Sequence, residues 1–448
     1  MRAPNARDTA LGVLVSCRTA GAWADAALKA QLRRDGLSGA EAALCSRIVY
    51  GVMQDRLLLD FYLGSYCSQK IDHLQPPLAE ILRIGAYQIL FLDKVPDSAA
   101  VNQAVEQAKA NGRAKASGLV NAVLRQVSRN KNDLPLIPDR DEVQYLSIRY
   151  SHPKWLVKRL LALLGREEAE VALAADNATA PLTVQINPLK TTMEDLTAEL
   201  ESSGVIVRKH PWVPGSLELE HAGDLTALAP FQDGKFLVQD PAARLVSQIA
   251  GVRPGMRVLD VCAAPGGKSF AAAFQMEDRG GIVACDLHEN KLKRIREGAE
   301  RLGLTCIRTE AADGRVFRAE WEDAFDAVLV DAPCSGLGII RKKPDVRYKK
   351  PDDLFALPVI QRAILDNAAR YVKPGGTLVY STCTILPEEN QEVTDGFLAE
   401  HPDFVRTPFA LPDPVGETEG QVTLWPHRHH TDGFYICRME RRLLRSDP

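Results

Sequence analysis

The chain has 448 residues, of which 46% are hydrophobic and 25% are charged, and its formal net charge is −3. This composition is typical of a folded protein with two or three domains, each with its own core. Charged residues interrupt the longest apolar runs before they reach the length of a membrane span, and Asp8 lies where an export signal needs apolar residues. We therefore expect a cytoplasmic protein that binds no membrane, with nine reduced cysteines.

Basic residues are concentrated toward the N-terminus. Residues 1–140 contain 18 Lys and Arg against 13 Asp and Glu, whereas the rest of the chain contains 37 against 45. The negative charge of the whole chain therefore conceals a basic N-terminal third. This asymmetry permits a nucleic-acid partner at that end without requiring one.

Residues 1–138 are predicted to form an all-α domain. Apolar side chains recur at the spacing of one helix face, first between Ala10 and Cys17 and again between Leu78 and Leu90, and strand signals are scarce. The following segment, residues 130–141, contains two prolines and many polar residues. It is the expected linker to the rest of the chain.

Residues 145–235 are predicted to form a small α+β module. A helix is expected from His152 to about Leu173. Short apolar strands are then expected at residues 183–187 and 204–208, on either side of a polar helix at residues 189–202.

Residues 236–445 are predicted to form an α/β domain. Four apolar strands are separated by helical stretches, at residues 256–261, 281–286, 325–331 and 376–381. Such alternation predicts a mostly parallel sheet that is covered by helices on both faces. The expected fold is therefore multidomain: an all-α domain, a small α+β module and an α/β domain.

A glycine-rich loop follows the first of these four strands. The strand is expected to end at Asp260, the run Ala263-Ala-Pro-Gly-Gly-Lys268 follows, and a helix is expected from Ser269. Glycines and free main-chain N–H groups at a helix start suit an anionic or carboxylate-bearing ligand. The end of the loop also matches a nucleoside-triphosphate P-loop, but Cys262 stands where that motif requires its first glycine. The sequence therefore favours a different cofactor loop.

Acidic residues follow the next strands in order. Asp286 closes the second strand, twenty residues after Gly266, where it can accept hydrogen bonds from a ribose. Asp313 lies where a further strand should end and could contact an adenine edge. Either aspartate alone could simply cap a helix. The ordered series of glycine loop, Asp286, Asp313 and Asp331 favours a cofactor site.

Two cysteines follow the last two predicted strands. Cys334 lies in the run Asp331-Ala-Pro-Cys-Ser-Gly, and Cys383 lies 49 residues later in Tyr380-Ser-Thr-Cys-Thr. Because parallel strands deliver their carboxyl ends to a common crevice, both thiols can face one substrate. A lone cysteine at a strand end is more often a packing residue, but two thiols beside a cofactor loop indicate covalent catalysis.

The chain resembles the S-adenosylmethionine-dependent RNA cytosine-5 methyltransferases. The resemblance is carried by the order and spacing of three runs, Val261–Lys268, Asp331–Gly336 and Ser381–Thr384. Residues 82–92, 101–106 and 118–125 are similar to the NusB-type helical domain. The chain as a whole resembles the bacterial Sun or RsmB branch, which methylates a cytidine of small-subunit (16S) ribosomal RNA. The resemblance implies an RNA-binding domain at residues 1–138, a small RNA-recognition module at 145–235 and a Rossmann-like methyltransferase domain at 236–445.

The resemblance also implies the chemistry of the two thiols. Carbon 5 of cytosine is a poor nucleophile, so a thiolate first adds to carbon 6 and forms a covalent intermediate. By resemblance Cys383 is the attacking thiol, and Cys334 helps to remove the carbon-5 proton and to release the enzyme. DNA cytosine methyltransferases instead attack with the cysteine of a Pro-Cys pair, here Pro333-Cys334. The spacing alone therefore leaves the roles of the two thiols open.

Two further residues receive catalytic roles. Asp331 is suited to hydrogen-bond the cytosine ring, and Lys268 is suited to hold the loop and to lower the pKa of a nearby thiol. The implied contacts to S-adenosyl-L-methionine are Cys262, Ala263, Ala264, Pro265, Gly266, Gly267, Lys268, Asp286, Asp313 and Asp331.

Two other polar runs invite a functional interpretation. Residues 425–434 include three histidines within four residues, but a zinc site usually has separated ligand pairs, so we expect a hairpin and no metal. Residues 341–350 carry six cations and one acid just after the Asp-Ala-Pro-Cys run, and this position favours phosphate contact over a purely solvated run.

Two other classes of protein would leave different patterns in the sequence. An RNA-binding or assembly protein without activity would be expected to lack a catalytic thiol or Lys268, and a small-molecule methyltransferase would need no helical RNA-binding domain. The sequence therefore favours an enzyme, expected to be a monomer, whose partner is small-subunit ribosomal RNA. It does not name the target nucleotide.

Overall fold

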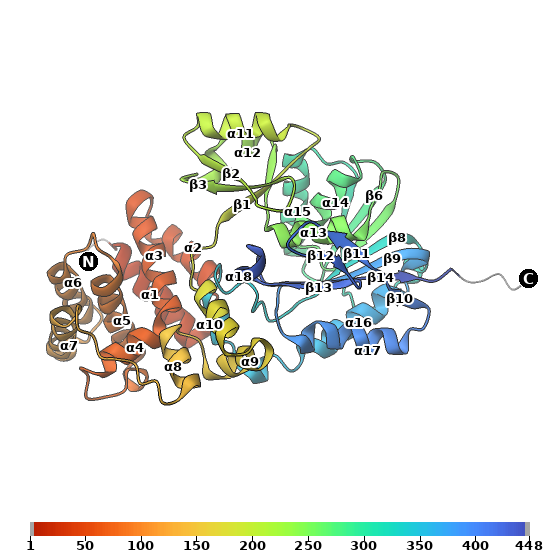
Figure 1. The fold of residues 1–448 in the computed structure, drawn as a ribbon. Helices are drawn as coiled ribbons and strands as arrows, with labels where there is room; N and C mark the ends of the chain where they lie inside the picture. The colour runs from red at the N-terminus through yellow and green to blue at the C-terminus, as the bar shows by residue number, and fades with distance from the viewer. Residues whose placement is uncertain (1–3, 444–448) are drawn as a thin grey trace, which may run out of the picture. The chain divides into compact units, whose positions relative to one another are not determined.

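The computed structural model describes residues 4–443 (Figure 1). The chain divides into two compact units. Unit 1 contains the chain up to Ala178 together with Ile340–Lys349, and unit 2 contains Thr179–Ile339 and the chain from Lys350 onward. Residues 1–3 of the first predicted domain and 444–445 of the third lie outside the described residues. In the described part, no helix is both long and apolar enough to cross a membrane.

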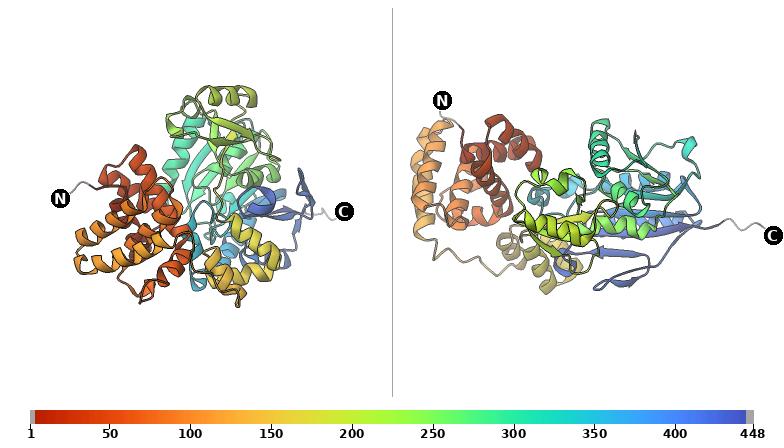
Figure 2. Two further views of the ribbon diagram at one scale, coloured as in Figure 1. Left: turned by 60° about the vertical axis from the view of Figure 1, so that its left-hand side comes forward. Right: turned by 90° about the horizontal axis from the view of Figure 1, so that it is seen from above.

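Unit 1 is built from helices. They are α1 (Ala6–Ala20), α2 (Ala24–Asp35), α3 (Gly39–Gln54), α4 (Arg56–Gly64), α5 (Pro76–Phe91), α6 (Asp97–Ala110), α7 (Ser117–Arg129), α8 (Glu142–Arg149), α9 (Lys154–Leu164) and α10 (Arg166–Ala175), with 3-10 turns η1 (Ile71–His73), η2 (Ala114–Ala116) and η5 (Pro344–Tyr348). Figures 1 and 2 show the red and orange helices of this unit gathered into one bundle. The predicted all-α character of the N-terminal part is confirmed.

Helix α5 forms the centre of the bundle. Twelve of its sixteen residues are buried, because apolar side chains surround almost its whole circumference. Gly85 allows α7 to approach closely, since a Cβ at this position would lie 2.4 Å from Leu124. The neighbouring helix α3 approaches in the same way at Gly51, where a Cβ would meet the ring of Tyr87. Small residues thus set the spacing of the central helices.

After α7, the structure agrees with the predicted linker at residues 130–141 but differs from the single helix predicted at residues 152–173. Residues 130–141 contain no helix or strand, and Asp141 then caps α8 by accepting a hydrogen bond from the main-chain N–H of Gln144. The single helix expected from 152 to 173 is instead two helices, α9 and α10. They are separated because Gly165 adopts a φ of +75°, which a continuous α-helix does not permit.

Arg347 ties the segment Ile340–Lys349 into unit 1. Its Nη1 lies 2.8 Å from Oδ1 of Asn177 and within hydrogen-bonding distance of the main-chain carbonyls of Gln54, Tyr150 and Ser151. The side chain has no exposed surface, and burial lowers the pKa of its guanidinium. The expected phosphate contact of the cationic run is therefore wrong for this residue, because its side chain is buried and its Nη1 already donates to acceptors inside the protein.

Unit 2 begins with a small antiparallel sheet of order β2–β3–β1–β4. The strands are β1 (Leu182–Ile186), β2 (Ile206–Lys209), β3 (Ser216–Glu220) and β4 (Phe236–Val238), accompanied by α11 (Met193–Ser202), η3 (Leu225–Ala227) and α12 (Ala229–Gln232). Val184, Leu196, Leu217 and Phe236 have no exposed surface and form the centre of its core. The predicted α+β character is confirmed, although the sequence pattern did not indicate β3.

The larger sheet has eight strands in the order β10–β14–β9–β8–β5–β6–β7, with β13 paired to β14. Its strands are β5 (Arg257–Asp260), β6 (Gly281–Asp286), β7 (Ile307–Ala311), β8 (Phe325–Asp331), β9 (Val372–Thr382), β10 (Phe404–Arg406), β13 (Gln421–Leu424) and β14 (Phe434–Arg441). A separate hairpin joins β11 (Phe409–Leu411) and β12 (Gly416–Thr418). Strands β5 to β9 pair with one another in parallel, whereas the pairs β9–β14, β10–β14 and β13–β14 are antiparallel. The mostly parallel sheet is therefore confirmed.

Helices cover both faces of this sheet. They are α13 (Pro241–Ala250), α14 (Gly267–Gln275), α15 (Glu289–Leu302), α16 (Leu357–Ala369) and α17 (Gln391–Glu400). The connections contain the short helix α18 (Pro426–His429) and the 3-10 turns η4 (Ala319–Trp321), η6 (Pro351–Asp353) and η7 (Pro387–Glu389). Figure 1 shows α14 and α15 on one side of the sheet and α16 and α17 on the other. Within β8, Ala327 and Leu329 pack into the core that contains residues of α13, α14 and α15. Val328 and Val330 pack into the core on the other face, which contains residues of α16 and α17. Burial of both faces explains the continuous apolar runs in the sequence.

The carboxyl ends of the central strands define one edge of the sheet. Strands β5, β6, β8 and β9 end at Asp260, Asp286, Asp331 and Thr382. Because these strands run in the same direction, the loops that follow them leave the sheet along this edge. Both cysteine loops and the glycine loop begin there.

Candidate active site

Cys334 and Cys383 lie in loops that leave two adjacent parallel strands. Asp331, the last residue of β8, is the register partner of Ser381 in β9. Shortly after these two residues, the Sγ atoms of the cysteines are 3.3 Å apart, and both side chains are partly exposed. The structure therefore brings together two thiols that are separated by 49 residues in the sequence.

A close main-chain contact holds the loop after Cys334. The main-chain N–H of Gly338 donates to the carbonyl of Cys383 at 3.0 Å, and the N–H of Gly433 donates to the carbonyl of Gly338 at 2.8 Å. A Cβ on residue 338 would lie 1.8 Å from the carbonyl oxygen of Gly433, so only glycine fits there.

The second thiol raises the pKa of Cys334 well above its usual range. The contact with Cys383 is the largest cause, burial adds to it, and the negative charges of Glu389 and Asp331 act in the same direction. Cys334 therefore holds its proton at neutral pH. Such a thiol can donate a hydrogen bond to the sulfur of Cys383.

Lys268 and Asp331 form an ion pair beside the thiols. Lys268 Nζ lies 2.6 Å from Asp331 Oδ2, and Ser381 Oγ donates to Asp331 Oδ1 at 3.0 Å. Burial alone would lower the pKa of Lys268, but the charge and hydrogen bond of Asp331 more than offset it and raise the pKa. The ammonium also lies over the ring of Phe434, 5.2 Å from its centroid. The pair fixes a positive and a negative group at the edge of the sheet.

The glycine loop turns directly into helix α14. Gly266 precedes the helix with a φ of +110°, and a Cβ there would lie 2.4 Å from the ring of Phe270. The loop is held at its start by the N–H of Ala263, which donates to the carbonyl of Cys285 at 2.7 Å. Helix α14 begins at Gly267, two residues earlier than expected, so Lys268 lies in its first turn. The first turn exposes main-chain N–H groups that can bind an anionic or polar ligand.

Two buried polar groups beside this loop have no hydrogen-bond partner within residues 4–443. They are Oδ1 of Asp260 and the side-chain amide of Gln239, whose residues are 0% and 8% exposed. A Cβ on Gly267 would lie 3.0 Å from Nε2 of Gln239, so the glycine leaves room in front of that amide. Asp260 has a pKa raised to about 6 by burial, and its other oxygen accepts from Ser269 Oγ at 2.7 Å. Unpaired buried polar atoms are expected where a polar ligand binds.

Asp286 and Asp313 lie after successive strands, as the sequence indicated. Asp286 is almost buried at the end of β6, where one oxygen accepts from the N–H of His288 at 2.9 Å and lies 3.4 Å from Nζ of Lys291. Asp313 follows β7 and pairs with Arg315 at 2.7 Å, and the hydrogen bonds of that guanidinium lower the pKa of Asp313. Asp313 therefore shares its carboxylate with a neighbouring side chain.

Glu389 is a polar residue of the site that the sequence pattern did not indicate. It is 1% exposed. Its Oε2 accepts from the N–H of Ser335 at 2.8 Å and from Nε2 of Gln361 at 2.9 Å, and its Oε1 accepts from Oγ1 of Thr384 at 3.3 Å. Ser335 and Thr384 directly follow the two cysteines. One buried carboxylate thus joins both cysteine loops.

The histidine run at residues 425–434 connects strands β13 and β14, which are antiparallel neighbours as expected. It forms the short helix α18, and Nδ1 of His429 accepts from the N–H of Trp425 at 2.8 Å. The carbonyl of His429 accepts from Nε1 of Trp212 at 2.7 Å. Across residues 4–443 no group of three or more His, Cys, Asp or Glu side chains is arranged to hold a metal ion.

The parallel sheet with a glycine loop after its first strand defines the second unit as a Rossmann-like domain of the methyltransferase class. Residues 248–440 match the family of 16S rRNA methyltransferases RsmB/F, residues 152–226 match the ferredoxin-like domain of RsmF/B-like methyltransferases, and residues 4–129 match the NusB family.

Full-length relatives carry the same combination. The chain is 38% identical to the probable ribosomal RNA small subunit methyltransferase B of Bacillus subtilis (strain 168), over 99% of this chain and 100% of that protein. It is 36% identical to the corresponding protein of Synechocystis, over 98% and 99% of the two chains. The crystal structure of PH0851 superposes with a TM-score of 0.81 at 28% identity and covers 97% of this chain and 98% of its own. The chain belongs to the RsmB/F family of 16S rRNA methyltransferases, on the branch of methyltransferase B.

Proposed function

We propose that this protein transfers the methyl group of S-adenosyl-L-methionine to carbon 5 of a cytidine in 16S ribosomal RNA through a covalent cysteine–cytosine intermediate. The observation that carries the proposal is the pair of thiols, Cys334 and Cys383, whose sulfurs are 3.3 Å apart. Their position beside the Lys268–Asp331 ion pair supports chemistry on a polar heterocycle.

The residues around the glycine loop fit the cofactor. We infer that Cys262 to Lys268 contact its amino-acid part, that Asp286 receives the ribose hydroxyls, and that Asp313 and Asp331 lie at the adenine and at the reactive end. The narrow turn at Gly266 and Gly267 and the unpaired polar atoms of Gln239 and Asp260 support a polar ligand there. When bound, S-adenosylmethionine supplies an electrophilic methyl group.

The side chains of the site then divide the chemistry. Cys383 adds as a thiolate to carbon 6 of the cytosine, and this raises the electron density at carbon 5. Asp331 hydrogen-bonds the ring while charge shifts onto it, and Lys268 holds Asp331 in place. After methyl transfer, Cys334 releases its own proton to solvent and, as a thiolate, takes the proton from carbon 5. The electron pair of that C–H bond forms the double bond between carbons 5 and 6, the bond between carbon 6 and Cys383 breaks, and Cys383 leaves as a thiolate.

The contact between the two thiols bears on the release step. It raises the pKa of Cys334 and favours its thiol form while the sulfurs are 3.3 Å apart. The contact changes once Cys383 is bonded to carbon 6. Cys334 can then release its proton to solvent and act as a base. The choice of Cys383 over Cys334 of the Pro333-Cys334 pair as the nucleophile rests on the family resemblance.

We propose that the remaining segments bind the RNA substrate. Residues 1–138 would form a NusB-like RNA-binding domain, residues 145–235 a recognition module and residues 236–445 the methyltransferase domain of a cytoplasmic monomer. The basic excess of the N-terminal third supports a polyanionic partner. The cationic run at 341–350 would contribute less than expected because Arg347 is buried.

A methyl-transfer assay tests the proposed activity. The protein is incubated with labelled S-adenosylmethionine and 16S rRNA, and the product is digested to nucleosides and analysed by mass spectrometry. The expected product is 5-methylcytidine in 16S rRNA and none on free cytidine. RNA binding without transfer would indicate an assembly protein, and transfer to free cytidine would indicate a small-molecule enzyme; either result would refute the proposal.

A further inference from the structure

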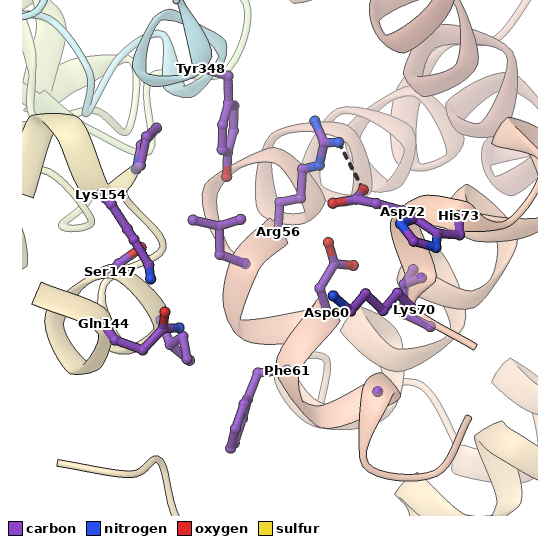
Figure 3. Close-up of a pocket in the computed structure, with 15 residues that line it drawn as sticks. Arg56, Asp60, Phe61, Lys70, Asp72, His73, Gln144, Ser147, Lys154 and Tyr348 are labelled. Carbon is purple, nitrogen blue, oxygen red and sulfur yellow. Dashed lines mark hydrogen bonds and ion pairs between the residues drawn. The ribbon is translucent and has the colours of Figure 1, made fainter. Parts of the chain in front are cut away.

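Unit 1 contains a cavity of its own, with a volume of about 700 Å³. It is lined by residues of α4, η1, α8, the start of α9 and Tyr348. Figure 3 shows Gln144, Ser147 and Lys154 along one side, Arg56, Asp60 and Lys70 along the other, and Tyr348 and Phe61 toward opposite ends. A cavity of this size can admit a small ligand or a short stretch of a larger one.

Arginine side chains neutralise the acidic groups of this cavity. Arg83 has no exposed surface and lies 2.7 Å from both Asp60 and Asp72 and 2.5 Å from Glu80. Burial alone would lower the pKa of Arg83, but the hydrogen bond with Asp60 and the neighbouring carboxylates raise it. Arg18 and Arg56 pair with Asp72, and Arg18 also pairs with Glu80. Three arginines thus balance three carboxylates.

Two lysines then leave the cavity with a net positive charge. Lys70 and Lys154 are exposed and line it from the residue before η1 and from the start of α9. Neither ammonium has an ion pair or hydrogen bond to any residue that the structure describes. His73 lines the cavity from η1, on the same side as Lys70. The cavity is therefore suited to an anionic ligand.

The ends of the cavity are aromatic. The guanidinium of Arg56 lies over the ring of Tyr348, 5.3 Å from its centroid, and the hydroxyl of Tyr348 donates to the carbonyl of Met53 at 2.8 Å. Phe61 is partly exposed at the other end. Aromatic and guanidinium planes beside unpaired lysines suit a ligand that carries both phosphates and unstacked bases.

We propose that this cavity binds one or two unpaired nucleotides of the RNA substrate, with Lys70 and Lys154 at the phosphates and Phe61 stacked on a base. The inference rests on the proposed RNA substrate and specifies where unit 1 holds it. Single-stranded RNA fits better than a duplex, because the bases of a duplex are already stacked on one another.

Binding of a labelled single-stranded RNA oligonucleotide to the full chain, followed by fluorescence anisotropy at several salt concentrations, tests this site. Replacing both Lys70 and Lys154 by Gln should weaken binding about tenfold and reduce the salt slope by about 1.4, because about 0.7 is lost for each phosphate of a single strand. Phe61→Leu should weaken binding about tenfold without changing the salt slope, and Phe61→Tyr should restore it. Lys293→Gln removes an exposed charge on α15, outside the segments proposed to bind RNA, and should change the affinity less than about twofold.

Unchanged affinity of the double lysine variant, or an equal loss in Lys293→Gln, would overturn the site. A polyglutamate peptide that displaces the RNA equally well from wild type and Phe61→Leu would assign the cavity to acidic peptides instead. A midpoint of thermal unfolding equal to that of wild type establishes that the fold of each variant is intact. The binding measurement needs no methyl transfer, so its failure is distinguishable from a failure of the proposed reaction.

A second inference comes from Glu389. We infer that Glu389 is a positioning residue that fixes Cys334 relative to Cys383; this also rests on the proposed function. Its contacts with Ser335 and Thr384 hold the residue after each cysteine. Gln361, which donates to Glu389, also donates to the carbonyl of Pro333 at 3.0 Å, so the main chain is held on both sides of Cys334.

Two substitutions separate geometry from charge. Glu389→Ala removes all three contacts and should lower kcat at least about 100-fold while KM for RNA and cofactor stays within about threefold. Glu389→Gln keeps an acceptor for Ser335 and Gln361, and its amide can donate to Thr384, so it should retain kcat within about fivefold. The matched control is Glu392→Ala, an exposed glutamate at the start of α17, which should behave as wild type.

The proximity of the thiols provides a readout that does not depend on methyl transfer. The diazene oxidant diamide couples two thiols into a disulfide and is itself reduced to a hydrazine. Wild type should form the Cys334–Cys383 bond rapidly, Glu389→Gln nearly as fast, and Glu389→Ala at least about tenfold more slowly. A wild-type rate in Glu389→Ala, or a Glu389→Gln variant as inactive as Glu389→Ala, would overturn the positioning role.

Discussion

Replacing Lys268 by Met should destabilise unit 2 and remove most of the activity, because Asp331 would lose its cation. The two charged atoms are 2.6 Å apart, and the side chains are only 12% and 28% exposed. At this separation two unit charges attract by about 6 kcal/mol at an effective dielectric constant of about 20, and desolvation offsets most of this energy. In a double-mutant cycle with Asp331→Asn we therefore expect a coupling energy of about 2 kcal/mol. The coupling energy is obtained from urea unfolding of the four proteins of the cycle, followed by hydrogen exchange of the main-chain amides of β8.

The control pair is Lys373–Asp326. Both residues lie at the amino ends of β8 and β9, away from the thiols, and their side chains are 38% and 30% exposed. Its coupling should stay below about 1 kcal/mol, and Lys373→Met should leave kcat within about twofold. Since the folded pKa of Lys268 is raised, the stabilising contribution of the pair is fully present below the ordinary pKa of 10.5 and is lost as the pH rises through the folded value. Equal coupling in the two pairs, or an unchanged kcat in Lys268→Met, would refute the reasoning.

Three further predictions concern other parts of the chain. Asp286→Ala should weaken S-adenosylmethionine binding about tenfold or more, since a charge-assisted hydrogen bond contributes about 1.5–3 kcal/mol, and calorimetry with unchanged affinity would contradict this role. Arg347→Met should lower the free energy of unfolding of unit 1 by about 3 kcal/mol, because buried acceptors lose their donor; an unchanged urea midpoint would contradict it. Burial, with the charge of Arg347, lowers the pKa of His152, so stability is present above pH 6.5 and is lost as the pH falls below it. His152→Gln should reduce this pH dependence of urea unfolding, and identical profiles would contradict the assignment.

The convergence of the two thiols followed from strand direction alone. Residues 325–331 and 376–381 were recognisable as buried strands because they are continuous apolar runs. Parallel strands place their carboxyl ends on one edge, so Cys334 and Cys383 had to lie on the same side of the sheet. The 3.3 Å contact between them depends on the loops, and the sequence pattern contains no signal for that distance.

Other features depend on contacts between distant segments and could not be read from the sequence. The cationic run at 341–350 has the pattern of a solvated surface, yet Arg347 is buried because carbonyls from α3 and the α8–α9 connection surround it. Glu389 follows another glutamate in a short 3-10 turn, where an acidic residue is ordinarily exposed. Its burial results from donors near Cys334 and Cys383, which lie elsewhere in the sequence.

Local backbone conformation explains the remaining difference. The apolar periodicity from 152 to 173 predicted one helix, and Gly165 within it could have been accommodated at a small cost. The positive φ of Gly165 instead allows the chain to turn between α9 and α10. Periodicity identified the buried faces correctly but could not distinguish a tolerated glycine from a helix boundary.

The most direct test of the central claim is whether an RNA adduct accumulates on one cysteine variant and not on the other. Each variant is incubated with 16S rRNA and S-adenosylmethionine and separated on a denaturing gel. Cys334→Ala should permit attack and methyl transfer but stall release, so a shifted protein–RNA band is expected, whereas Cys383→Ala should give neither adduct nor product. An adduct on Cys383→Ala and none on Cys334→Ala would make Cys334 the nucleophile and contradict the proposed roles of the two thiols.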